Sequence, residues 1–368
     1  MKFFAEIKTW VTVVFLVAAC GLSSYAGENK LSTPGSIAVI ASTVPANGDL
    51  NPYGIARVPK SNGSLTEGNI LVSNFNSSAN LQGTGTTVVQ ITPEGVVSLF
   101  AKIDATTLPG PCPGGVGLTT ALWALRSGWV IVGSVPTTDG TSATVQAGCL
   151  LVLNSSGKVV ETFYGSLING PWDMTALDAG GSANLFVTNV LNGTVAGGGK
   201  VVHGGTVTRV TLTGLNGKMP DLQSITVIGS GFSERTDPAA LVIGPTGLSL
   251  SPNADLLYVA DSLNNRVTAI PDPVLRDTSA GTGATLTQGG SLNDPLGLTV
   301  GQDGNILTVN GDNGFLVVTT PDGDQLYKTL LDSSGNPPGN GALFGLVDVA
   351  GQGLYYVDDA TNTLNLRQ

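Results

Sequence analysis

The sequence predicts an all-β fold, a six-bladed β-propeller closed by an N-terminal strand that completes the last blade. Three observations predict this fold. The composition is rich in glycine and poor in charge, one strand pattern recurs six times, and a spare strand near one end matches a missing strand at the other. A propeller blade is a four-stranded antiparallel sheet of roughly 40–50 residues, so six blades fit a chain of this length.

The composition favours short strands joined by tight turns. Of the 368 residues, 51 are glycine, 41% are hydrophobic and 11% are charged. Glycine adopts the positive φ angles that tight turns require, and the hydrophobic fraction is sufficient for a packed core. The formal net charge is −10. Such a surface repels phosphate backbones, so no nucleic-acid partner is expected.

One pattern recurs along residues 36–368. In each copy a turn that ends in Gly, or once in Asp, leads into an apolar strand, and a second apolar strand then ends on Asn, Asp or Ser. The first strands begin at Tyr53-Gly54-Ile55, Val116-Gly117-Leu118, Trp172-Asp173-Met174, Thr246-Gly247-Leu248, Leu296-Gly297-Leu298 and Phe344-Gly345-Leu346. Third and fourth strands follow around a Gly turn, as in 88–92 and 96–101.

The two ends of the repeat region complement each other. The last copy has a third strand at Thr363–Arg367 but no fourth strand, whereas Ser36–Ser42 is a strand that precedes the first copy and has no partner. Pairing these two segments completes the last blade and leaves no open sheet edge. The pattern therefore predicts a closed ring.

The first 26 residues predict export. Residues 1–10 carry two lysines, and residues 11–20 are almost wholly apolar but too short to form a permanent transmembrane helix. Ser24-Tyr25-Ala26 suits ordinary signal peptidase, whereas Val17-Ala18-Ala19-Cys20 resembles a bacterial lipobox that would place a lipid on Cys20. Both sites stay open. We expect a secreted or periplasmic protein, or one anchored through Cys20, with residues 27–35 as a linker and 36–368 as a single propeller without a transmembrane segment.

Two cysteines remain outside the targeting segment, Cys112 and Cys149. In an oxidising compartment they predict one disulfide bond, and two unpaired buried thiols are the alternative.

One blade carries a family resemblance. The segment Leu256–Ile270 (LLYVADSLNNRVTAI) resembles the NHL repeat. The resemblance implies a six-bladed ring in the group of exported bacterial propellers that includes TolB-like and gluconolactonase-like members. It implies no activity, because propellers host unrelated functions. Arg266 in this segment is expected to pair with a nearby acid.

The candidate ligand-binding residues are expected at one mouth of the central channel, where the first strands begin. They are Tyr53, Trp172, Asp173, Thr246, Asp294 and Phe344. Trp172-Asp173 breaks the repeat, because Asp stands where the other copies have Gly. An aromatic plate beside a carboxylate suits a sugar or a cationic ligand. The alternative is a Trp packed between blades, with Asp173 bonded to backbone N–H groups.

The resemblance also implies where a metal would bind. Gluconolactonase-type propellers hold a divalent metal at this mouth, with Asn or Asp just before the Gly of the turn, but here Thr246 and Leu296 occupy matching positions. No metal, cofactor or catalytic residue is therefore predicted. Virginiamycin-lyase-type propellers need His and Glu, and the single histidine, His203, lies in the Gly-rich segment 197–205, which is expected to be a surface loop.

These observations favour an exported, monomeric, non-catalytic binding or scaffold protein that holds an unknown protein, peptide or glycan. The alternative is a metal-dependent lactonase-like hydrolase or lyase with a degenerate site at the channel mouth.

Overall fold

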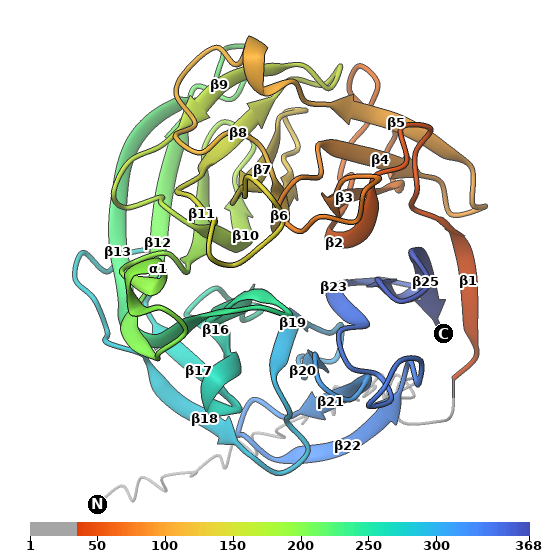
Figure 1. Cartoon of the computed structure of the whole chain (residues 1–368), viewed down its shortest axis with the longest axis vertical. Coiled ribbons are helices and arrows are strands. Elements are labelled where there is room, and N and C mark those ends of the chain that lie inside the picture. The colour runs from red at the N-terminus through yellow and green to blue at the C-terminus, as the bar shows by residue number, and fades with distance from the viewer. Residues whose placement is uncertain (1–34) are drawn as a thin grey trace, which may run out of the picture.

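Six antiparallel sheets surround a central channel in the computed structural model, which describes residues 35–368 (Figure 1). The chain is a six-bladed β-propeller. The first three blades are β2 (Leu50–Arg57), β3 (Ile70–Asn76), β4 (Thr87–Ile91) and β5 (Val97–Lys102); β6 (Leu118–Ala124), β7 (Val130–Ser134), β8 (Cys149–Leu153) and β9 (Val159–Phe163); and β10 (Pro171–Asp178), β11 (Ala183–Asn189), β12 (Val202–Thr213), β13 (Asp221–Asp237) and β14 (Leu241–Ile243).

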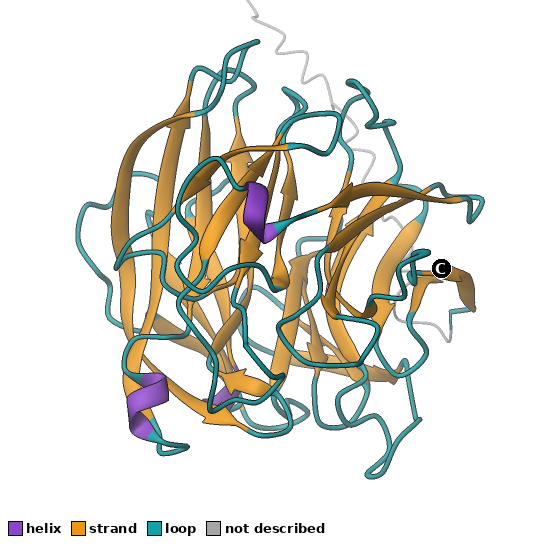
Figure 2. Ribbon diagram, turned by 45° about the horizontal axis from the view of Figure 1, so that its top comes forward, coloured by secondary structure: helices purple, strands orange, loops and turns teal. Residues whose placement is uncertain are grey.

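The last three blades have four strands each. They are β15 (Pro245–Leu250), β16 (Leu256–Asp261), β17 (Arg266–Pro271) and β18 (Ala284–Gln288); β19 (Pro295–Val300), β20 (Ile306–Asn310), β21 (Phe315–Thr319) and β22 (Gln325–Leu330); and β23 (Leu343–Val349), β24 (Gly353–Asp358), β25 (Thr363–Arg367) and β1 (Ile37–Ser42). The helical turns lie in loops (Figure 2): α1 (Thr194–Gly197), η1 (Ala105–Thr107) and η2 (Ser262–Asn264).

The predicted closure of the ring is confirmed. β1 pairs antiparallel with β25, from Ile37 opposite Arg367 to Ser42 opposite Thr363 (Figure 1). An apolar cluster next to this pair joins the last blade to the first, and it includes Val357 and Leu364 of the last blade and Ile55 of the first. The innermost strands β2, β6, β10, β15, β19 and β23 contact one another in this order, and β23 contacts β2.

A β-bulge interrupts the innermost strand of every blade near its start. In β19, for example, Pro295 pairs with Asn310 and Leu298 with Thr308, so that Leu296 and Gly297 together oppose a single residue. A Cβ on Gly297 would lie 1.9 Å from the carbonyl oxygen of Phe344 in the next blade. Glycine is required there because the neighbouring backbone approaches so closely.

The second blade departs from the predicted alignment. In β6, Leu118 pairs with Ser134 and Leu122 with Val132, so three residues rather than two oppose Gly133. The residues level with Gly54 are Thr120 and Ala121, because a Cβ on Gly54 would lie 2.8 Å from the Thr120 carbonyl oxygen. The predicted turn 116–118 ends where β6 begins, so Val116 is not a channel residue and packs against the core between the first two blades.

The predicted disulfide is confirmed, and it joins Cys112 to Cys149 with an S–S distance of 2.12 Å. Cys112 lies in the loop before β6, and Cys149 begins β8. The bond therefore fixes the entry of the innermost strand of this blade to its third strand.

Replacing both cysteines with Ser should lower the free energy of unfolding by roughly 3–4 kcal/mol, because the bond closes a loop of 37 residues in the unfolded chain. Denaturant unfolding of the oxidised protein and of the double variant measures this difference. Wild-type protein reduced with a thiol should match the variant, and equal midpoints for all three would contradict the prediction.

Within residues 35–368, the structure has no helix that is both long enough and apolar enough to cross a membrane.

Candidate functional site

The channel has two ends that differ in chemistry. We call the end where the innermost strands begin, at the bulges, the upper mouth, and the end where they finish, near Arg57 and Thr299, the lower mouth. Loops between the first and second strands and between the third and fourth strands of a blade lie on the lower side. The remaining loops lie on the upper side, because successive strands of each blade are antiparallel.

An aromatic cluster fills part of the upper mouth. Tyr53 stacks between Phe75 and Phe344, with ring centroids 4.2 and 3.8 Å apart, and the Trp172 ring meets Tyr53 edge-on at 6.3 Å. Tyr53 and Trp172 are 3% and 4% exposed. Three of the predicted ligand-binding residues therefore meet, but as a packed cluster. Trp172 follows the alternative interpretation, a ring buried between blades, and presents no open aromatic plate.

The other predicted residues divide. Thr246 is 2% exposed, and its hydroxyl bonds the Gly244 carbonyl and the Ser262 hydroxyl at 3.0 Å each, so it serves the backbone of its own blade. Asp294 lies on the upper side. Burial there, reinforced by the neighbouring charge of Asp312, raises the pKa of Asp294 to about 7. Only Asp173 among the six predicted residues lines the cavity inside the channel.

Inside the channel lies a cavity of about 160 Å³. All six innermost strands contribute to its wall, which is mainly apolar. Four hydroxyl groups and two charged side chains interrupt it, and they are Thr120, Thr175, Ser249, Thr299, Asp173 and Arg57. The cavity is smaller than the usual ligand pocket of about 300–1,000 Å³. It therefore suits a small molecule.

Asp173 owes its place in the cavity to the break in the repeat. The equivalent residues of four other blades are glycines, whereas β10 carries a side chain there. One carboxylate oxygen, Oδ1, accepts a hydrogen bond from the Met174 backbone N–H at 2.7 Å, and no other hydrogen bond or ion pair of this carboxyl exists within residues 35–368. Burial without an opposite charge raises the pKa of Asp173 to about 7.

Arg57, at the end of β2, was not singled out in the sequence. It lines the same cavity, and its Nε is buried without a hydrogen-bond partner. No carboxylate pairs with its guanidinium in the described part of the chain. The one signal in the sequence is that Arg57 is basic, whereas no other blade has a basic residue at the same level. The residues there are Ala124, Ala176, Leu250, Val300 and Asp348.

Glu234 is a buried carboxyl on the upper side, outside the channel cavity. Its Oε1 accepts hydrogen bonds from the Thr194 hydroxyl at 2.8 Å and from the Asn192 N–H at 3.1 Å, whereas Oε2 has no partner. Burial raises the pKa of Glu234 to about 7, and burial beside Asp358 does the same for Asp359.

The raised carboxyl pKa values predict that the protein is more stable in mild acid. Between pH 4 and 7 the folded state binds more protons at Asp173, Glu234, Asp294 and Asp359 than the unfolded state does, so stability falls as pH rises through this window. The melting temperature should be higher at pH 5 than at pH 8. Charge repulsion within an acidic chain also lowers stability as pH rises, so Asp173→Asn serves as the control. This variant should show a smaller fall in melting temperature between pH 5 and pH 8. A melting temperature that rises toward pH 8 would contradict this prediction.

The residues that the structure describes do not fit a resident metal ion. No group of three or more His, Cys, Asp or Glu side chains converges there, and hard cations such as Ca²⁺ take six to eight oxygen ligands. Among the described residues that line the channel cavity, Asp173 is the only acidic one, and the other side-chain oxygens that could bind a cation are hydroxyl groups.

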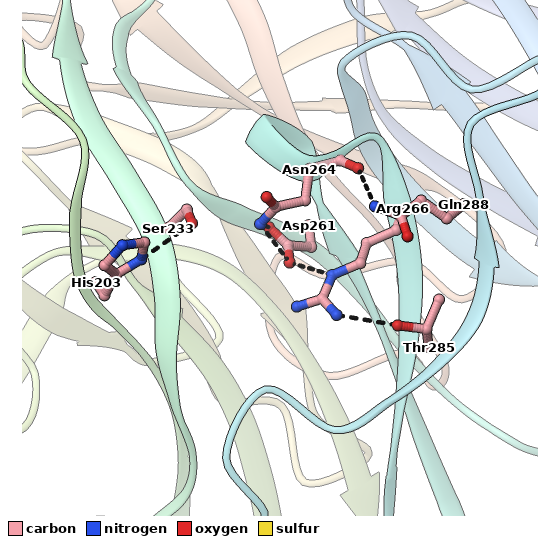
Figure 3. A network of polar contacts seen from close by, with 7 residues as sticks. All are labelled: His203, Ser233, Asp261, Asn264, Arg266, Thr285 and Gln288. Atoms are coloured by element: carbon pink, nitrogen blue, oxygen red, sulfur yellow. Dashed lines mark hydrogen bonds and ion pairs between the residues drawn. The ribbon is translucent and has the colours of Figure 1, made fainter.

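The NHL-like segment makes a local polar network on the fourth blade (Figure 3). Arg266 Nε lies 2.6 Å from Asp261 Oδ2, Asn264 donates to both oxygens of that carboxylate at 3.0 Å, and Arg266 also donates to Thr285. Arg266 therefore pairs with a local acid, as expected. These side chains hold a turn together and are not free to bind a ligand.

His203 departs from its predicted place in a loop. It belongs to β12, whose pairing with β13 extends to Val202, and its Nδ1 lies 3.2 Å from the Ser233 hydroxyl (Figure 3). It is exposed and does not line the channel cavity.

Solved structures share this fold. The gluconolactonase XC5397 from Xanthomonas campestris is 15% identical with a TM-score of 0.52, and the comparison covers 91% of this chain and 96% of that one. A calcium-binding regucalcin from Agrobacterium tumefaciens is 13% identical with a TM-score of 0.56, covering 89% and 93%. Virginiamycin B lyase from Staphylococcus aureus is 13% identical with a TM-score of 0.51, covering 90% and 99%. The chain matches no protein-family model and no curated protein sequence.

These comparisons correct the preferred functional prediction. Identities of this order show the fold alone, yet the neighbours named as a gluconolactonase and a lyase are enzymes. The interpretation as a non-catalytic binding or scaffold protein is therefore wrong, and the enzymatic alternative is the better supported one.

Proposed function

We propose that this protein is a hydrolase of the lactonase-like group, that it cleaves a small ester or lactone inside the channel cavity, and that Asp173 transfers the proton. The observation that carries the proposal is the state of Asp173. It is a carboxyl in a cavity, it is not paired with any cation of residues 35–368, and burial raises its pKa to about 7. A general base works best when its pKa lies near the operating pH, and such perturbed groups cluster at active sites.

The proposed reaction adds one water molecule across a C–O bond. The Asp173 carboxylate takes a proton from water, and the water oxygen bonds to the carbonyl carbon while the carbonyl π electrons move to its oxygen. When this oxyanion collapses, the bond to the ester or ring oxygen breaks, and Asp173 returns the proton to that leaving oxygen. The products are a hydroxy acid from a lactone, or an acid and an alcohol from an ester, and Asp173 is regenerated.

The wall of the cavity offers groups for the remaining tasks. Oδ1 of Asp173 is held by the Met174 N–H, which leaves Oδ2 to meet the water. The hydroxyls of Thr175, Ser249 and Thr299 supply donors for the developing oxyanion. In an apolar wall, such donors stabilise charge more strongly than they would in water.

We further propose that the protein is exported, that its fourth blade is an NHL repeat, and that it is a monomer. The Cys112–Cys149 bond supports export, because disulfides persist in oxidising compartments. The signal segment 1–26 and Cys20 lie outside the residues that the structure describes. N-terminal sequencing and mass measurement of the exported protein would distinguish cleavage after Ala26 from lipidation at Cys20.

The test of the proposed activity is a hydrolysis screen. Purified protein is incubated with small aryl esters and with five- and six-membered lactones, with and without added Ca²⁺ or Zn²⁺, and acid release is followed by titration. We expect turnover that needs no added metal and that rises with pH to a plateau, with an inflection near pH 7. Turnover that appears only with metal, or none with any substrate, would overturn the proposal.

A further inference from the structure

The channel cavity contains a cation, Arg57, that no side chain of residues 35–368 neutralises. Within residues 35–368, Arg57 makes no side-chain hydrogen bond or ion pair, and its Nε is buried without a partner. A buried polar atom without a hydrogen bond destabilises the fold, and more so when the group is charged. The cost is removed if a bound anion accepts those bonds.

The carboxylates near the lower mouth are already engaged by backbone groups. Asp178 accepts from the N–H groups of Arg126 and Gly180 at 2.6 and 2.7 Å, and Asp348 accepts from the Gln302 N–H at 3.0 Å. Neither pairs with Arg57. The guanidinium therefore remains available to a ligand.

The surface beside this end of the channel is also basic. A groove of about 410 Å³ is lined by loops on the lower side of the first three blades and includes Lys60 and Arg126. No Asp or Glu lines the groove within the described part of the chain. Asp178, which accepts from the backbone N–H groups of the lining residues Arg126 and Gly180, offsets one of the two positive charges. The groove keeps a net positive charge, which favours anions on this side of the molecule.

The positions of Arg57 and Asp173 set the form of the ligand. Asp173 in β10 lies level with Gly54 in β2. Arg57 follows Gly54 by three residues in β2. At about 3.3 Å per residue, the two levels are about 10 Å apart along the channel, before the reach of the arginine side chain is subtracted. A ligand that touches both side chains needs its anionic group several bonds from its reacting carbonyl.

We infer that the substrate enters through the lower mouth and is an ester or lactone that carries a carboxylate, which Arg57 binds while the reacting carbonyl lies at Asp173. This inference rests on the proposed function for the reaction, but the carboxylate site stands on Arg57 alone. The planar guanidinium donates two parallel hydrogen bonds to a carboxylate. A single guanidinium in a cavity of about 160 Å³ matches a planar carboxylate monoanion better than a larger phosphate dianion. The aromatic cluster narrows the upper mouth, and Arg57 lies at the lower end, so entry from the lower side is the route that this inference takes.

Binding without turnover tests the inference. Hexanoate, hexyl phosphate and hexylammonium share one alkyl chain and are titrated calorimetrically into wild-type protein and into Arg57→Gln, Arg57→Lys and Lys102→Gln. Lys102 is an exposed residue at the end of β5, so Lys102→Gln removes the same charge far from the channel.

We expect hexanoate to bind best, to lose at least about tenfold in affinity in Arg57→Gln, and to lose less in Arg57→Lys, with no change in Lys102→Gln. Asp173→Asn should retain hexanoate binding. Preference for hexyl phosphate or hexylammonium, or hexanoate affinity that is unchanged in a folded Arg57→Gln variant, would overturn the inference. If hexanoate binds as expected but no ester is cleaved, the proposed function fails and the carboxylate site stands.

Discussion

Asp173→Asn should reduce hydrolysis by about 10²–10⁴-fold, the usual contribution of a positioned general base. The amide keeps the shape of the side chain but cannot take a proton from water. The effect should appear in kcat more than in KM, because the proton moves only in the transition state. The inflection near pH 7, which reports the raised pKa of Asp173, should disappear from the residual activity. Initial rates between pH 5 and 9 measure both effects.

Asp294→Asn is the matched control for this experiment. Burial raises the pKa of Asp294 to about 7 as well, but its side chain lies outside the channel cavity. This variant should keep its activity and its pH profile. Asp173→Gly provides a second comparison, because glycine is the residue of the equivalent position in β2, β15, β19 and β23. It should be inactive yet fold at least as well as wild type. Activity retained in Asp173→Asn would remove this residue from the mechanism.

The architecture was predictable because the innermost strands of adjacent blades pack closely around the channel, and this packing recurs around the ring. Each innermost strand must pass its neighbour closely, and this requirement places Gly at positions such as Gly247, where a Cβ would lie 2.4 Å from the Leu296 carbonyl oxygen. The glycine recurs in four of the six blades, β2, β15, β19 and β23, and is visible as a repeat. The spare strand and the missing strand were equally visible, because an unpaired sheet edge leaves backbone groups without partners.

The site was only partly predictable. Asp173 stood out because it stands where the other copies of the repeat have glycine, and it does line the cavity. The direction of the aromatic rings could not be read from the repeat, because packing of Tyr53 between Phe75 and Phe344 depends on two neighbouring blades. The second blade was misaligned by its longer bulge, which hid Thr120. Arg57 went unnoticed because a charged residue at the end of a strand ordinarily points to solvent.

Removing the closing strand should have the largest effect on stability. Without residues 36–42, β25 loses its partner at five paired positions, and Leu364 loses cover. At about 1 kcal/mol per hydrogen bond, the lost pairing alone costs on the order of 5 kcal/mol. The ring is then open at an exposed sheet edge, which invites aggregation. We expect insoluble protein, or a melting temperature lower by at least about 10 °C.

A chain that begins at residue 35 is the control for the deletion, because it keeps β1 and every other described strand.

Two point variants test whether β1 closes the ring without shortening the chain. Ile40 packs against the cluster that joins the first and last blades, whereas the Val39 side chain is 66% exposed. Ile40→Asp should therefore lower the melting temperature sharply, because it places a charge against apolar side chains, and Val39→Asp should be tolerated. Thermal denaturation followed by circular dichroism compares the four chains with wild type. If the deletion melts at the temperature of its control, the blade is stable with three strands and β1 does not hold the ring closed.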